Sequence, residues 1–173
     1  MLAIAIPFVE ICLLRRAPQD LPASPLLLGI AVTAHVGLGI LVTALHYPLL
    51  TAIGVSFTGT GLLALLAFVL LSARGFGRRF TQTFAAFAGT GAVLQAIAFP
   101  LVALLEGADP GGASAAAGVI LTIPWLALLV WSWVVSGHIL RHALSVHLTA
   151  GIGISMAFFW LSALVIHQLF GNP

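Results

Sequence analysis

Charge is scarce in this chain. Of its 173 residues only 6% are Asp, Glu, Lys or Arg, whereas soluble proteins average about 25%. Hydrophobic residues make up 61%, and a soluble core of this size would leave too little polar surface to face water. Lysine is absent, and the six arginines are spread over three short segments, which excludes a nucleic-acid-binding patch. The composition therefore indicates a membrane protein.

Other absences narrow the chemistry. The single cysteine, Cys12, excludes an intrachain disulfide and any Cys-x-x-Cys metal or redox motif. The sequence contains no P-loop, no Gly-x-Ser-x-Gly, no His-Glu-x-x-His and no Gly-x-Gly-x-x-Gly motif. We therefore expect a protein without enzymatic activity and without a cofactor.

What the chain has instead is long apolar segments without charge. Each is at least about 20 residues long, which is enough to cross the hydrocarbon core of a bilayer as a helix. The sequence predicts an all-α polytopic membrane protein whose residues 25–173 form one bundle of five transmembrane helices. The predicted spans are 26–46, 49–73, 80–105, 115–137 and 145–170.

The arginines alternate with these spans. They precede the first span, lie between the second and third, and lie between the fourth and fifth, whereas the other gaps and the carboxyl end contain neither Lys nor Arg. Because short cytoplasmic loops are enriched in basic residues, this pattern predicts a cytoplasmic amino terminus and a carboxyl terminus outside. We expect the location to be a bacterial inner membrane.

Residues 1–24 form a separate amino-terminal segment. Its first 14 residues are apolar but too short to span a bilayer, and Glu10 interrupts them. We expect an amphipathic helix on the membrane surface, although a frayed apolar tail is the alternative. A proline-rich cytoplasmic linker follows and ends at Ser24-Pro25, a helix N-cap followed by proline at the first helical position. The residues expected to face lipid are Leu2, Ile6, Val9 and Leu13.

Small residues recur at helical spacing within the spans. Helices in a bilayer associate through such residues because lipid provides no hydrophobic drive between them. We expect packing seams at these positions, among them Ala85, Gly89, Ala92 and Ala96 in the third span and Gly151 and Ser155 in the fifth.

Two polar side chains fall deep within the spans. His35 lies near mid-membrane with no histidine at the same depth to complete a haem site, and Gln95 is the carboxamide of the third span. An ionisable residue at this depth suggests function, but neutral imidazole can also be satisfied by an interhelical hydrogen bond. A hydrogen bond between His35 and Gln95 and a proton path both remain open.

Three further histidines cluster on the arginine side of the fourth and fifth spans. His138 and His142 are four residues apart and would share one helical face if the helix continued through Gly137. Together with His147 they support an alternative function as a haem- or metal-binding redox protein or a small-solute transporter. No cysteine or carboxylate lies nearby in the sequence to complete a ligand set.

The leading hypothesis places the interaction surface on the cytoplasmic side. The few charges gather there while the spans carry none, so we expect contacts with membrane lipids, another membrane protein or a second copy of the chain, and none with nucleic acid. The predicted surface consists of Glu10, Arg15, Arg16, Asp20, Arg78, Arg79 and Arg141.

Three stretches resemble the bacterial Yip family of small five-span membrane proteins. The stretches are Phe76-Gly-Arg-Arg-Phe-Thr-Gln-Thr-Phe84 continuing to Ala98-Phe-Pro100, the stretch 124–145, and the leader 8–18. The resemblance implies a five-span membrane fold and a role in membrane organisation, without an established reaction. The eukaryotic relatives bind Rab GTPases through a longer cytosolic amino-terminal region, so Rab binding does not carry over to this chain.

Overall fold

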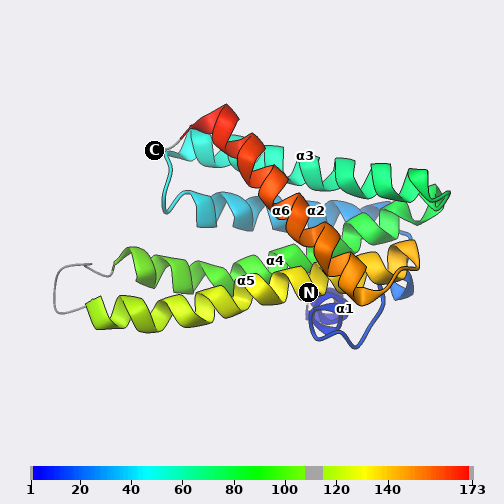
Figure 1. Cartoon of the computed structure of the whole chain (residues 1–173), viewed down its shortest axis with the longest axis horizontal. Coiled ribbons are helices and arrows are strands. Elements are labelled where there is room, and N and C mark those ends of the chain that lie inside the picture. Colours follow the sequence, from blue (N-terminus) through cyan, green and yellow to red (C-terminus); the bar gives the residue numbers. More distant parts are fainter. Residues whose placement is uncertain (1, 108–114, 172–173) are drawn as a thin grey trace.

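All regular structure in the described part of the chain is helical. The computed structural model describes residues 2–107 and 115–171, with side chains described for 4–107 and 118–171. The helices are α1 (Leu2–Cys12), α2 (Pro25–Thr43), α3 (Leu49–Ala73), α4 (Phe80–Glu106), α5 (Ala115–Leu144) and α6 (Leu148–Phe170), with short 3₁₀ turns η1 (Pro18–Asp20) and η2 (Gly77–Arg79). Helices α2 to α6 are each long and apolar enough to cross a membrane. The all-α, five-span prediction is confirmed (Figure 1).

The helix starts follow the expected local chemistry. Ser24 caps α2, since its Oγ accepts the backbone N–H of Leu27 at 3.3 Å, and Pro25 occupies the first helical position. Helix α3 has the bounds predicted for the second span. Helix α2 ends at Thr43, three residues before the predicted limit at 46.

Helix α5 extends beyond the predicted limit of the fourth span at residue 137. Helix α5 continues without interruption to Leu144, and the chain turns only at Ser145, whose φ is 56°. Gly137 lies inside this helix and is closely packed against α6. A Cβ atom added to Gly151 of α6 would overlap the backbone of Gly137. The fifth span correspondingly begins at Leu148, three residues after the predicted start at 145.

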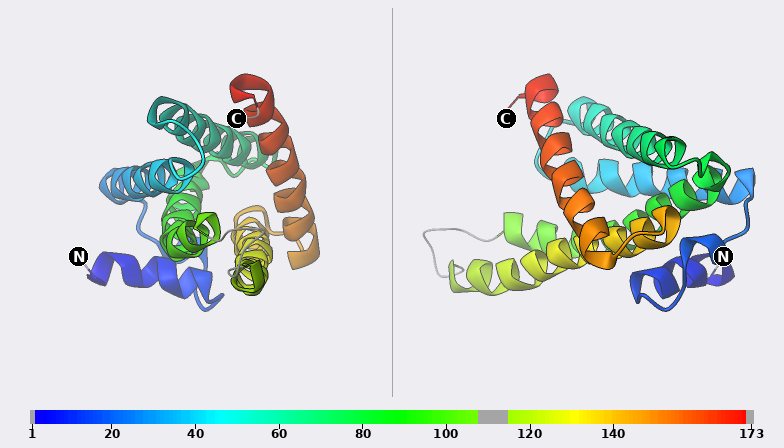
Figure 2. Two further views of the ribbon diagram at one scale, coloured as in Figure 1. Left: turned by 90° about the vertical axis from the view of Figure 1, so that its left-hand side faces the viewer. Right: turned by 45° about the vertical axis from the view of Figure 1, so that its right-hand side comes forward.

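Helix α4 occupies the centre of the bundle. It contacts α1, α2, α3 and α5, and every residue from Thr83 to Thr90 is buried. The end-on view in Figure 2 shows α4 surrounded by these neighbours. The predicted seam of small residues holds for Ala85, Gly89 and Ala92, but Ala96 is exposed. The seam therefore covers only the first part of the helix.

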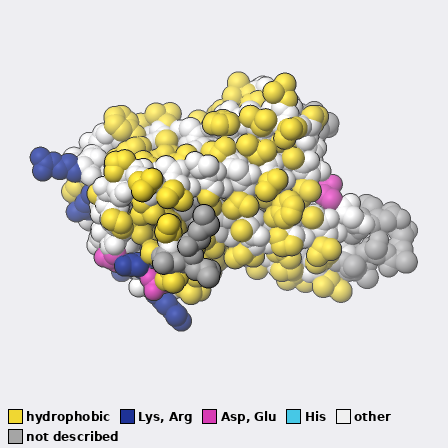
Figure 3. Space-filling view, turned by 180° about the vertical axis from the view of Figure 1, so that it is seen from behind, with side chains coloured by type: hydrophobic (Ala, Val, Ile, Leu, Met, Phe, Trp, Pro, Cys, Tyr) yellow, Lys and Arg dark blue, Asp and Glu magenta, His cyan; other side chains and the backbone are white. Residues whose placement is uncertain are grey.

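The outer surface of the bundle is apolar. Leu50 and Leu26 expose 82% and 74% of their surface, and many further large hydrophobic side chains are exposed on α2 to α6. Figure 3 shows hydrophobic atoms distributed over the whole visible face. Monomeric soluble proteins rarely expose so much contiguous apolar surface, whereas lipid requires it.

Helix α1 runs across the bundle rather than along it (Figures 1 and 2). One face, with Phe8, Ile11 and Cys12, is buried in the core cluster formed with α4 and α5. Gly89 of α4 makes this possible, because a Cβ atom there would overlap the Phe8 ring. The opposite face is exposed, as expected for Ile6, Val9 and Leu13. The amino-terminal segment is therefore helical. One face of this helix packs against the bundle, and its other face is apolar and exposed.

Candidate functional site

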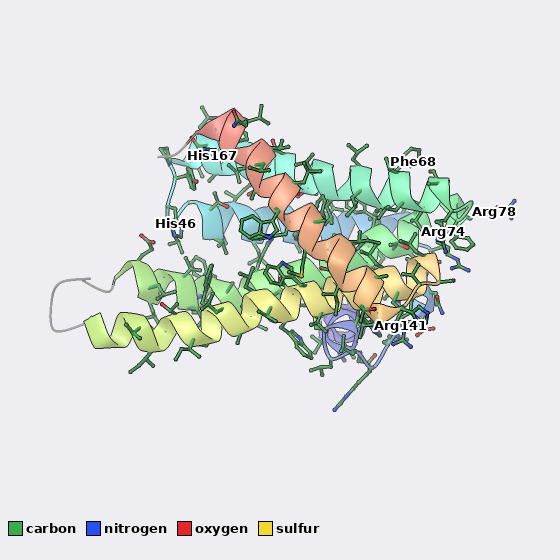
Figure 4. All side chains as sticks on the ribbon, in the orientation of Figure 1. His46, Phe68, Arg74, Arg78, Arg141 and His167 are labelled. Atoms are coloured by element: carbon green, nitrogen blue, oxygen red, sulfur yellow. The ribbon has the colours of Figure 1, made fainter. Side chains whose placement is uncertain are left out.

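The arginines gather at one end of the bundle. Figure 4 shows Arg74, Arg78 and Arg141 together there, while His46 and His167 lie at the opposite end. We call the end that carries Arg74, Arg78, Arg79 and Arg141 the arginine end. The structure thus brings together basic residues that are far apart in the sequence.

Two of these arginines are used within the protein. Arg74 Nη2 donates to the carbonyl oxygen of Leu144 at 3.1 Å, and Arg79 Nη1 donates to that of Ala143 at 3.2 Å. The last carbonyls of an α-helix lack intrahelical partners and carry partial negative charge, so both guanidinium groups cap α5. Arg79 also lies over the Phe76 ring, 4.4 Å from its centroid. Of the predicted interaction surface, Arg79 therefore has a structural role.

The carboxylates of the amino-terminal segment are also engaged. Glu10 Oε2 pairs with Arg16 Nη1 at 2.9 Å, and Asp20 Oδ2 accepts the backbone N–H of Ala17 at 2.9 Å. Arg15, Arg78 and Arg141 are exposed, and none of them pairs with a carboxylate among the described residues. These three are the cations left for an external partner.

Side chains from α4 and α5 hold the amino-terminal segment in place. Trp131 Nε1 donates to Cys12 O at 3.0 Å, His138 Nε2 donates to Arg16 O at 3.0 Å, and Gln82 Nε2 donates to Leu21 O at 2.6 Å. No pattern in the sequence pointed to these contacts. Trp131 lies in the interior of α5, where a tryptophan of an apolar helix is equally typical of ordinary packing.

Cys12 is buried under this segment. Its side chain is 6% exposed, and Sγ lies 3.9 Å from the carbonyl oxygen of Thr90. Burial away from water disfavours the thiolate and raises the pKa of Cys12 to about 11. The thiol is therefore a packing group and not a reactive one.

Two of the three clustered histidines do meet. The rings of His138 and His142 lie 4.6 Å apart, edge to face. Because the carbonyl of Arg16 can only accept, Nε2 of His138 carries the proton and is not free to bind a metal. Within residues 2–107 and 115–171, no group of three His, Cys, Asp or Glu side chains could hold a metal ion, so His147 does not complete a site with them.

His35 and Gln95 form the interhelical hydrogen bond considered above. Gln95 Nε2 lies 3.3 Å from His35 Nδ1, which accepts the amide hydrogen. The imidazole packs against α4 at Gly91, where an added Cβ atom would lie 2.6 Å from Nδ1. A larger residue at 91 would push the ring away, so the glycine positions this pair.

The His35–Gln95 pair borders a cavity of about 350 Å³ inside the bundle. Its walls come from α3, α4, α5 and α6, with His35 reaching in from α2. No sequence pattern pointed to this cavity, because its lining residues come from five helices and include isolated serines.

Comparisons with known proteins add no assignment. No protein-family model, no curated protein and no solved structure matches this chain, so the resemblance to the Yip family has no support from them. What the structure supports is a five-span integral membrane protein.

Proposed function

We propose that this chain is a non-enzymatic integral protein of a bacterial inner membrane, with the arginine end in the cytoplasm, that acts by binding anionic lipid headgroups. The observation that supports it is the set of three exposed arginines, Arg15, Arg78 and Arg141, which come from three separate segments. Figure 4 shows Arg78 and Arg141 at the arginine end, and Arg15 precedes Arg16, whose carbonyl oxygen is bound by His138 of α5. Short loops rich in arginine stay in the cytoplasm, where the leaflet is also rich in anionic lipid. Each arginine near that surface would gain about 1 kcal/mol.

In the cell, the proposed role of such lipid binding is membrane organisation, as in Yip-like proteins. It rests on the sequence resemblance and on the short amino-terminal segment, which is folded onto the bundle by Trp131, His138 and Gln82. That segment adds Arg15 to the basic surface and keeps it there.

The proposal is tested by comparing vesicles of phosphatidylcholine with vesicles that contain one third phosphatidylglycerol. We expect the protein to unfold at higher temperature in the anionic vesicles and this gain to disappear in Arg15→Gln/Arg78→Gln/Arg141→Gln. Added salt at about 1 M should also remove the gain, since it shortens the screening length to about 3 Å.

The matched control is Arg16→Gln, because Arg16 already pairs with Glu10 in the protein. It should retain most of the stabilisation by phosphatidylglycerol. Equal unfolding temperatures of the unaltered protein in both kinds of vesicle would contradict the proposal, as would an equal gain in the triple variant.

A further inference from the structure

The cavity bordered by His35 and Gln95 has the size and depth of a ligand site. Its volume of about 350 Å³ falls within the range of roughly 300–1,000 Å³ typical of small-molecule pockets. His35 lies ten residues into α2, which is about 15 Å along the helix, and Ser162 lies eight residues before the end of α6. The cavity is therefore in the middle of the helices, where lipid and not water surrounds the bundle.

The walls combine flat aromatic and aliphatic groups. Phe87 of α4, Trp133 of α5 and Phe158 and Phe159 of α6 line the cavity, and the rings of Trp133 and Phe159 meet edge to face at 5.6 Å. Such walls favour a ring, which can stack on or meet their faces and edges.

Hydroxyl groups around the cavity offer hydrogen-bond acceptors. Thr90, Ser132 and Ser155 donate to carbonyls of their own helices, at 2.7, 2.6 and 2.9 Å. Each oxygen keeps a lone pair that can accept a hydrogen bond. Three serine or threonine residues thus present acceptors on α4, α5 and α6.

Three other lining residues carry polar atoms without a partner. Gln95 Oε1, Trp133 Nε1 and Ser162 Oγ are buried and make no hydrogen bond within the described part of the chain. A buried unpaired polar group costs about 1–3 kcal/mol. A molecule that supplied both a donor and an acceptor would recover part of that cost.

The same walls exclude a charged ligand. None of the residues that line the cavity is Asp, Glu, Lys or Arg, so an ion would lose its hydration without gaining a counter-charge. From size, shape and polarity together, we propose that the cavity binds an uncharged, lipid-soluble molecule whose head group is a single ring with both a hydrogen-bond donor and an acceptor, as in phenols and quinols.

Neighbouring hollows indicate where such a molecule enters. A groove of about 150 Å³ between α4 and α5 shares Leu94, Gln95 and Ser132 with the cavity. A hollow of about 450 Å³ at the end opposite the arginines shares Phe159 and Ser162. Toward the arginine end, Leu71, Ala143 and Leu144 are buried in the core. Entry is therefore from the lipid phase or the end opposite the arginines.

The test uses the purified full chain in detergent micelles and three probes with the same ring and tail. These are 4-butylphenol, which has a donor and an acceptor, butylbenzene, which has neither, and 4-butylbenzoate, which is charged. By titration calorimetry we expect saturable one-to-one binding of the phenol. Butylbenzene should bind about tenfold more weakly, because it loses one or two hydrogen bonds. The benzoate should show no saturable binding.

Variants locate the binding. Ser162→Leu should narrow the cavity beside Phe159 and strongly weaken phenol binding. Ser162→Ala should weaken it by roughly fivefold, the loss of one hydrogen bond. Thr122→Leu is the control, because Thr122 is an exposed hydroxyl on α5 outside the cavity. If Ser162→Leu fails to fold, Gln95→Leu replaces it and should weaken phenol binding but not butylbenzene binding.

Three results would overturn the proposal. Two of them are the absence of saturable phenol binding and equal binding of the phenol and butylbenzene, since either means that the polar groups recognise nothing. The third is phenol binding that is as strong in the Ser162 variants, or in Gln95→Leu where it replaces Ser162→Leu, as in Thr122→Leu. That result would place the probe in the micelle or on the outer surface.

Discussion

Single glycines determine how closely the helices of this bundle approach. At Gly91 the imidazole of His35 occupies the space that a side chain would take, and at Gly89 the ring of Phe8 does the same. Gly37 and Gly153, in contrast, have nothing within 4 Å of an added Cβ atom. Replacement by alanine should therefore lower the stability at glycines that contact another helix and not at glycines with open space.

Gly91→Ala should destabilise the protein by about 1–3 kcal/mol, because its Cβ forces His35 away from α4 and breaks the contact with Gln95. Gly37→Ala on α2 is the control, since nothing lies within 4 Å of its added Cβ. It should leave the stability unchanged or raise it by up to about 1 kcal/mol through better helix propensity. Thermal unfolding in detergent measures both. Equal stability of the two variants would show that His35 is not held at Gly91.

Cys12 should resist alkylation in the folded protein. With a pKa of about 11, roughly one thiol in a thousand is ionised at pH 8, and the side chain is buried. A raised pKa means that the folded state favours the protonated thiol. The contribution of this pKa shift to the free energy of unfolding is therefore fully present below the ordinary pKa of 9.0. It is lost as the pH rises toward 11.

The measurement is the rate of modification by a maleimide at pH 8, before and after denaturation. The control is Gln19→Cys in a Cys12→Ala background, because Gln19 is exposed on η1. We expect fast labelling at 19 and slow labelling at 12 until the protein unfolds. Similar rates in the folded state would mean that α1 is not docked.

At the scale of helices, the sequence predicted what depends on local pattern. Uninterrupted apolar length located all five spans, and the capping chemistry of Ser24 and Pro25 located the start of α2. Helix α5 continues to Leu144, beyond the predicted limit of the fourth span at Gly137. The role of this glycine depends on α6, which approaches Gly137 through Gly151. A contact between two helices is not visible in the pattern of either one.

That contact yields a prediction for the α5–α6 pair. Gly151→Ala should separate the two helices and destabilise the bundle by about 1–3 kcal/mol, since the added methyl group meets the backbone of Gly137, which cannot move aside as a side chain can. Gly153→Ala, two residues further on, has open space and should cost nothing. Unfolding by sodium dodecyl sulfate, followed by circular dichroism, compares them. A tolerant Gly151→Ala would contradict the close approach of α5 and α6.

The candidate site was predictable to a similar degree. The collection of arginines at one end follows from their placement between alternate spans, and the His35–Gln95 pair follows from their depth. Which arginines bind within the protein was not predictable, because Arg74 and Arg79 donate to the terminal carbonyls of α5, 70 and 64 residues away in the chain. The cavity likewise depends on how α6 crosses the bundle (Figure 1).

For the molecule as a whole, charge is segregated along the bundle. Arg74, Arg78 and Arg141 lie at the arginine end (Figure 4), where Arg79 also binds the carbonyl of Ala143. Arg15 and Arg16 belong to the amino-terminal segment, and Glu106 pairs with His46 at the opposite end at 2.9 Å. Between the two ends, the surface is apolar (Figure 3). This arrangement is what a fixed orientation in a bilayer requires.

The orientation is tested most directly by reporter fusions in bacterial cells, one inserted at Gly77 in the loop between α3 and α4 and one placed after Pro173. Alkaline phosphatase is active only outside the cytoplasm, and green fluorescent protein fluoresces only inside. We expect fluorescence alone at Gly77 and phosphatase activity alone after Pro173. Phosphatase activity at Gly77, or fluorescence after Pro173, would contradict a five-span protein with its arginine end in the cytoplasm.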